Sequence, residues 1–111
     1  MMAYKWLAAV KEAAKRYFPD KPLHTQIIRR TRIKIRIEIG EDIFADLFYR
    51  EETERVDYTL IVAYKRYYGL DNLGGWHEHP IGTPESHILI NQPTPGEAIS
   101  RLRKAVDELS R

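Results

Sequence analysis

Three of the four histidines in this chain, His77, His79 and His87, lie in the segment 75–87, which reads GWHEHPIGTPESH. His77 and His79 are two positions apart, so in an extended strand both imidazoles point to the same side. A Pro- and Gly-rich turn follows them and would return His87 beside the pair. Three imidazoles leave a coordination position for water, as catalytic zinc or iron sites do. A metal site at these histidines is therefore one interpretation.

A second interpretation needs no cofactor. Imidazole is a general acid or base near neutral pH, and an arginine such as Arg66 would bind phosphate. Together these groups would cleave RNA, with the 2′-hydroxyl as internal nucleophile. Glu78 and Glu85 would serve as an additional base, or as a fourth ligand if a metal were bound. A third interpretation is an ordinary turn whose histidines donate to backbone carbonyls. We expect a site without a cofactor, and the sequence leaves all three interpretations open.

A basic stretch precedes this segment and offers a contact surface for nucleic acid. Alternate positions of one strand face, about 6 to 7 Å apart, would follow a phosphate backbone, with Phe44 and Phe48 of the next strand as stacking surfaces for bases. The alternative is a solvated face that discourages edge aggregation and is neutralised by Asp46 and Glu52. The residues are Arg29 and, at alternate positions, Arg30, Arg32, Lys34 and Arg36.

Length and composition limit the class of protein. The 111 residues, 43% hydrophobic and 31% charged, fit one domain over 1–111. The net charge of +2 gives no strong overall field, and the absence of cysteine excludes disulfides and thiol catalysis. No apolar run approaches the roughly 18 residues that span a membrane, and lysines interrupt the N-terminal segment where a signal peptide needs an apolar centre. We expect a cytoplasmic protein.

The hydrophobic pattern predicts the elements that would position these groups. Residues 3–18 repeat apolar side chains at helical spacing, and Pro19 ends the run. Residues 20–24 are expected to form a linker. Strict alternation over 33–39 predicts a half-buried strand, and a second strand is expected over 43–49.

The parity of these two strands predicts their register. Ile39 is expected opposite Ile43, with residues 40–42 as the turn, so Arg36 would face Asp46 and Arg30 would face Glu52.

The rest of the chain is expected to complete an α+β fold. Residues 56–68 read as one long central strand, followed by a short irregular strand and a last strand over 87–91. Thr94, Pro95 and Glu97 form a helix-start signature. The prediction is an antiparallel meander sheet of four to five strands, with the N-terminal and C-terminal helices packed on one face.

The order of these features resembles the TumE family of toxin-antitoxin toxins. The resemblance rests on residues 58–68 leading into Asp71 and Asn72, and on the histidines that follow beside Pro80 and Pro84. It implies a growth-inhibiting toxin, neutralised by a cognate antitoxin encoded next to it, typically one with a DNA-binding domain. The functional group that it implies consists of Asp71, Asn72, His77, His79 and His87.

Another class of function stays open beside the toxin. The exposed sheet face and edge would suit a non-catalytic binding or assembly module, including a homodimer.

Overall fold

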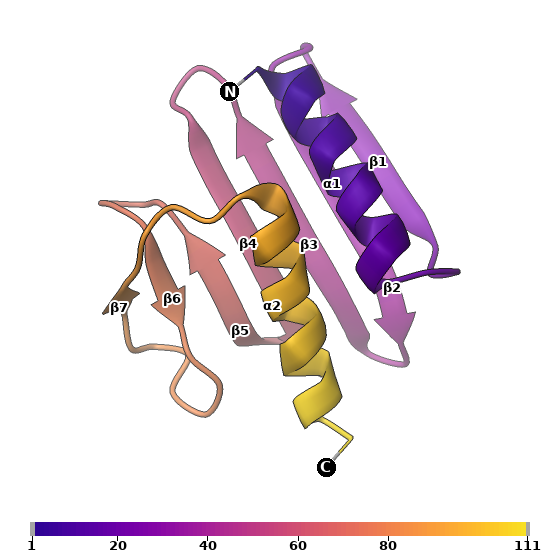
Figure 1. Cartoon of the computed structure of the whole chain (residues 1–111), viewed down its shortest axis with the longest axis vertical. Helices are drawn as coiled ribbons and strands as arrows, with labels where there is room; N and C mark the ends of the chain where they lie inside the picture. The colour runs from indigo at the N-terminus through magenta and orange to yellow at the C-terminus, as the bar shows by residue number, and fades with distance from the viewer. Residues whose placement is uncertain (1, 111) are drawn as a thin grey trace.

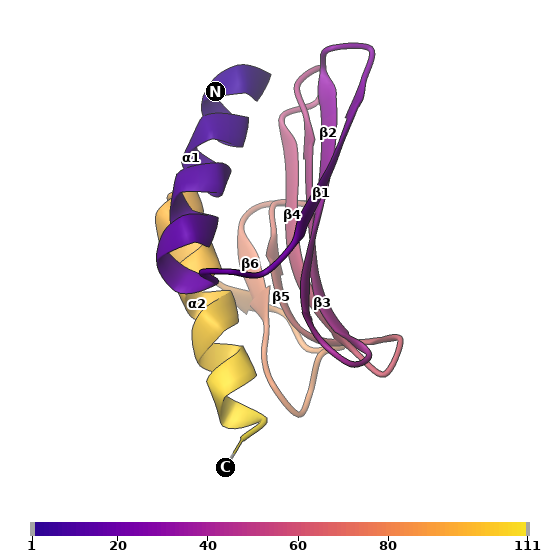
Figure 2. The same ribbon diagram turned by 90° about the vertical axis from the view of Figure 1, so that its right-hand side faces the viewer.

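A computed structural model describes residues 2–110 and forms two layers. Helices α1 (Ala3–Tyr17) and α2 (Pro95–Glu108) pack together and lie on the same side of one seven-stranded antiparallel sheet (Figures 1 and 2). Each strand pairs with the next one along the chain, so the sheet is a simple meander. The strands are β1 (Leu23–Ile28), β2 (Arg32–Gly40), β3 (Ile43–Arg50), β4 (Arg55–Val62), β5 (Lys65–Asp71), β6 (His77–His79) and β7 (Ile88–Leu89).

The α+β meander with terminal helices is confirmed, but the expected four to five strands are wrong. The segment 56–68 is not one strand: it is the hairpin of β4 and β5, which turns at Ala63 and Tyr64 with φ of 51° and 65°. Two consecutive left-handed residues match the twist of a two-residue hairpin, a turn that normally uses Asn and Gly. Neither residue is of that kind, so the sequence carries no signal for the turn.

The expected linker at residues 20–24 is also corrected, because Leu23 begins β1. This strand pairs with β2 through a turn at Arg29 and Arg30, whose φ values are 52° and 64°. Arg30 therefore lies in a turn and not on the strand face with the other basic residues. Its expected partner Glu52 instead accepts a hydrogen bond from Thr31 at 2.7 Å.

The predicted register of β2 and β3 is confirmed over most of its length, with Arg36 opposite Asp46. At the turn a bulge places Gly40, rather than Ile39, opposite Ile43. One face of β2 is buried beneath the helices, as the alternation predicts; its side chains are Ile33, Ile35, Ile37 and Ile39.

Both helices pack against the buried face of the sheet. In α1, the Trp6 indole is buried and donates a hydrogen bond from Nε1 to the Tyr58 hydroxyl at 3.0 Å. The predicted start of α2 is confirmed as a capping box between Thr94 and Glu97. Within residues 2–110, no helix is long and apolar enough to cross a membrane.

Candidate functional site

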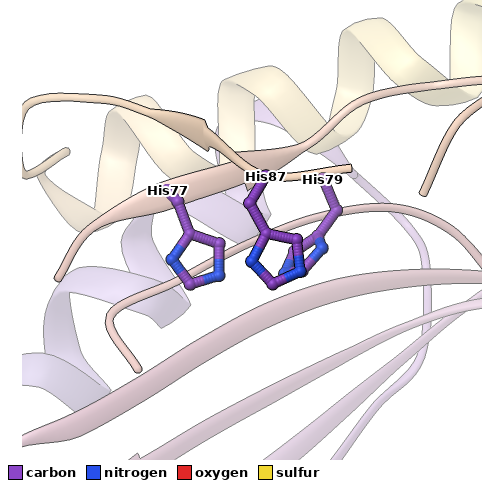
Figure 3. Close-up of side chains that lie close together, drawn as sticks. All are labelled: His77, His79 and His87. Carbon is purple, nitrogen blue, oxygen red and sulfur yellow. The ribbon is translucent and has the colours of Figure 1, made fainter. Parts of the chain in front are cut away.

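The three histidines of segment 75–87 converge at one end of the sheet. His77 and His79 lie on β6, and His87 lies just before β7. Their rings lie side by side and point in the same direction (Figure 3). In the sheet register Asp71, the last residue of β5, stands opposite His77. Because side chains alternate along a strand, this group occupies the face opposite to that of Glu78, which contacts Tyr68 on the helix-covered side.

Asp71 joins two of the imidazoles. Its Oδ2 lies 2.8 Å from His79 Nε2, and its Oδ1 lies 3.2 Å from His77 Nε2. The other nitrogen of each ring is held by the backbone: His77 Nδ1 lies 2.9 Å from the Gly75 carbonyl, and His79 Nδ1 lies 2.9 Å from the Pro84 carbonyl. Both nitrogens of both rings therefore face oxygen acceptors.

The turn after β6 makes the last of these contacts. Thr83 N–H donates to the Pro80 carbonyl at 3.3 Å, and Ser86 N–H donates to the Thr83 carbonyl at 2.9 Å. Gly82 has a φ of 87°, a conformation that L side chains rarely adopt. These two successive turns place the Pro84 carbonyl next to His79 Nδ1 and return the chain to His87.

The carboxylate of Asp71 is ionised although it is buried. Burial acts to raise its pKa, but the Leu73 N–H at 3.0 Å, the His79 hydrogen bond and the charges of His77 and His79 outweigh burial, so the pKa lies below its usual value. A neutral imidazole that donates from Nδ1 to a carbonyl presents a lone pair at Nε2. Each Nε2 faces a carboxylate oxygen of Asp71 at 2.8 or 3.2 Å, a position that either a proton or a metal ion can bridge.

His87 completes the histidine cluster, which we define as His77, His79 and His87. Its ring stacks on His77 with centroids 4.6 Å apart and an interplanar angle of 6°, and meets His79 edge-on, also at 4.6 Å. One ring nitrogen from each of the three lies within 4.8 Å of the others. His87 is exposed, and its nitrogens make no hydrogen bond to any described residue. It is the accessible imidazole of the cluster.

The structure does not bring every predicted site residue to this cluster. Asn72 is turned away: its Nδ2 donates to the Glu54 carbonyl at 2.7 Å and its Oδ1 accepts from the Val56 N–H at 2.9 Å. It ties the loop after β5 to the turn before β4. Arg66 is exposed near the start of β5, opposite Ile61, about 10 Å along the strand from the position that pairs with His79.

A row of three arginines crosses the same open face and was not found from the sequence. Arg32 pairs with Arg50 in the register, and Arg50 pairs with Arg55, so the three lie side by side on β2, β3 and β4. The Nε of each is buried without a hydrogen-bond partner among the described residues. Glu52 lies 3.8 Å from two of them, and Asp57 lies 3.1 Å from the third. Only the register of two hairpins aligns this arginine row.

The arginine row and the histidine cluster share the open face. The next row of the register, one pleat or about 7 Å along the strands, runs from Phe48 through Asp57 and Asp71 to His77, which lies on β6, two strands beyond Arg55 on β4.

Two hollows meet on the open face at Phe48. One, of about 500 Å³, is lined by Phe48, Arg50, Thr53, Arg55, Asn72, Leu73 and Gly74. The other, of about 520 Å³, extends over β1 to β3 and includes Lys34 and Arg36. The Phe48 ring therefore stands between basic side chains on both sides.

The expected neutralising contacts of the basic stretch are present. Arg36 forms two hydrogen bonds with Asp46, at 2.9 and 3.1 Å, and its guanidinium lies 3.9 Å from the centre of the Phe44 ring. Lys34 is also exposed but, among the described residues, forms no ion pair. The open face is thus a mixture of paired and available positive charge.

Comparison with models of known families, with curated proteins and with solved structures gives no match to this chain. The resemblance to the TumE family therefore rests on the residues that carry it, and what it implies is a matter of proposal.

Proposed function

We propose that this protein is a toxin-like component of a toxin-antitoxin system that acts on RNA, with the open sheet face as binding surface and the histidine cluster as reactive centre. One observation carries the proposal: the arginine row and the histidine cluster occupy neighbouring rows of one sheet face. A single-stranded RNA that crosses the strands would contact both.

The arginine row supplies phosphate contacts. Guanidinium groups bind phosphate through paired N–H donors, and adjacent strands hold Arg32, Arg50 and Arg55 about 5 Å apart. Phe48 lies between the two hollows and offers a ring on which a base would stack. Glu52 and Asp57 compete for these arginines, so RNA must displace or share those ion pairs.

The cleavage step would use the sugar of the RNA itself. The 2′-oxygen attacks the adjacent phosphorus while the bond to the 5′-oxygen breaks, which gives a 2′,3′-cyclic phosphate and a 5′-hydroxyl. A base accepts the 2′-hydroxyl proton, and an acid supplies a proton to the 5′-oxygen. His87 is the exposed imidazole suited to one of these transfers, whereas the nitrogens of His77 and His79 already face acceptors.

RNA binding is tested by fluorescence anisotropy with a labelled single-stranded RNA, in chelator and at several salt concentrations. The triple variant Arg32→Gln, Arg50→Gln, Arg55→Gln should reduce the slope of log affinity against log salt by about 2, since each lost phosphate contact removes about 0.7. Phe48→Ala should weaken binding by about 1 to 3 kcal/mol. Lys104→Gln removes an equal charge from the exposed side of α2 and is the control for a single charge. Equal effects of Lys104→Gln and Arg50→Gln would refute the binding surface.

Cleavage and toxicity are tested with the same protein. Wild type should cut the RNA but not a DNA of the same sequence, because DNA has no 2′-hydroxyl, and His87→Gln should abolish cutting while RNA binding is retained. Induced expression should slow growth, and co-expression of the neighbouring gene should restore it. A wild-type chain that neither cuts RNA nor slows growth would contradict the proposed function.

A further inference from the structure

Asp71 lies 2.8 and 3.2 Å from two buried imidazoles, and the third imidazole of the histidine cluster lies beside them. We propose that Asp71, His77, His79 and His87 bind one divalent first-row transition metal ion of the zinc class. This differs from the cofactor-free site expected from the sequence.

The backbone sets the tautomer that a metal requires. The carbonyls of Gly75 and Pro84 accept from Nδ1 of His77 and His79, at 2.9 Å each, so those nitrogens carry the protons. Each Nε2 is then left with a lone pair on the side of Asp71. Metal-ligating histidines commonly donate their other N–H to a carbonyl or carboxylate in this way, which fixes the ring orientation and raises the basicity of the ligand.

The distances fit a common ion. Zinc binds imidazole nitrogen at about 2.0 to 2.1 Å and carboxylate oxygen at a similar distance, so neighbouring ligands of a tetrahedron lie about 3.3 Å apart. The oxygens of Asp71 lie 3.2 Å from His77 Nε2 and 2.8 Å from His79 Nε2. A single ion between these atoms therefore needs only small shifts of the side chains.

His87 supplies the third imidazole of the site. One nitrogen of its ring lies within 4.8 Å of one nitrogen of His77 and of one nitrogen of His79, and its side chain is exposed. Its ring lies 4.6 Å from each of the other two rings, so three imidazoles converge beside the carboxylate that contacts His77 and His79.

The donor set indicates the class of ion. Three imidazoles and one carboxylate suit zinc, iron, cobalt or nickel, whereas calcium and magnesium prefer sites made of oxygen ligands alone. The chain contains no cysteine, so no thiolate competes for the ion. A bound ion would supply Lewis acidity to a phosphoryl oxygen at the end of the proposed RNA surface, and His87 would then be its ligand instead of the proton-transfer group of the metal-free step.

The test measures metal binding without RNA, so its outcome is independent of the proposed function. Protein stripped with chelator and dialysed is titrated with Co²⁺, followed by visible absorption, and with Zn²⁺, followed by calorimetry. We expect one ion per chain, four-coordinate cobalt absorption and a rise in melting temperature with Zn²⁺.

The four histidines supply matched variants. His87→Gln changes an exposed residue and should lower affinity at least tenfold, as should His79→Gln where that variant folds. His24→Gln is the control, because His24 lies on β1 next to Glu38, far from the cluster in the sheet order, and it should bind as wild type does. Absence of saturable binding by wild type, equal binding by wild type and His87→Gln, or loss of binding in His24→Gln would each overturn the site.

Discussion

Replacing the buried carboxylate of Asp71 by an amide, Asp71→Asn, is the most informative perturbation of this fold. Asp71 is only 3% exposed; its carboxylate accepts from the Leu73 N–H at 3.0 Å and lies 2.8 and 3.2 Å from Nε2 of His79 and His77. The amide keeps one acceptor oxygen, but it removes the negative charge and directs an NH₂ group at one of the rings. Breaking a buried ionic pair by neutralising one partner costs about 3 to 5 kcal/mol.

Urea unfolding in the presence of chelator measures this loss of free energy, so that no metal contributes. Thermal unfolding under the same conditions should show a melting temperature lower by about 12 to 20 °C, because about 4 °C corresponds to 1 kcal/mol for a chain of this size. Asp46→Asn makes the same chemical change on the same sheet face, but the Asp46 side chain is 44% exposed, so its pair with Arg36 is worth about 1 kcal/mol or less. An Asp71→Asn variant within about 1 kcal/mol of Asp46→Asn would refute the charged cluster.

Three further predictions concern the scaffold. Thr94→Ala removes half of the capping box of α2 and should lower the free energy of unfolding by about 1 kcal/mol in urea. Burial raises the pKa of Tyr58 from 10.0 to about 12, against the lowering effect of the Trp6 hydrogen bond. The folded state therefore releases this proton less readily than the unfolded chain, so the contribution of Tyr58 to stability should be constant below pH 10 and fall by about 3 kcal/mol from there to pH 12. Tyr58→Phe should make the alkaline loss of stability smaller by that amount in urea unfolding measured against pH, and the raised pKa of Tyr68 should leave a remainder. Ala63→Asn with Tyr64→Gly should raise the melting temperature, because left-handed backbone costs an ordinary residue about 1 to 2 kcal/mol; an unchanged value would show that the turn carries no strain.

The parts of the fold that the sequence predicts are those with a strong local pattern. The isoleucines of β2 alternate without interruption, so the buried face and the pairing of Arg36 with Asp46 follow from parity alone. Thr94 and Glu97 mark the start of α2 for the same reason, since a capping box is complete within four residues. The β4–β5 hairpin is not predicted, because Ala63 and Tyr64 adopt a left-handed backbone conformation that their side chains do not favour.

In the candidate site, too, only the parts with a local sequence pattern could be predicted. The proximity of His77, His79 and His87 is readable from their spacing and from the Pro-Gly turn between them. The pairing of Arg50 with Arg32 and Arg55 depends on the register of two hairpins, one of which begins at a bulge, and no local pattern contains it. Asn72 was placed by resemblance, and its part in bracing the turn before β4 depends on a contact with a segment 16 to 18 positions earlier.

The meander also sets the order in which the molecule can assemble during synthesis. Each strand from β2 to β7 is able to pair with the strand before it as soon as it leaves the ribosome, because every pairing is between neighbours in the chain. Helix α1 precedes the sheet in the chain, yet its Trp6 contacts Tyr49 on β3 and Tyr58 on β4, and the helix packs against α2, which follows the sheet. The apolar side of α1 can therefore be covered only in stages, first by β2 to β4 and then by α2, and until α2 has formed it is open to a chaperone or to a partner protein.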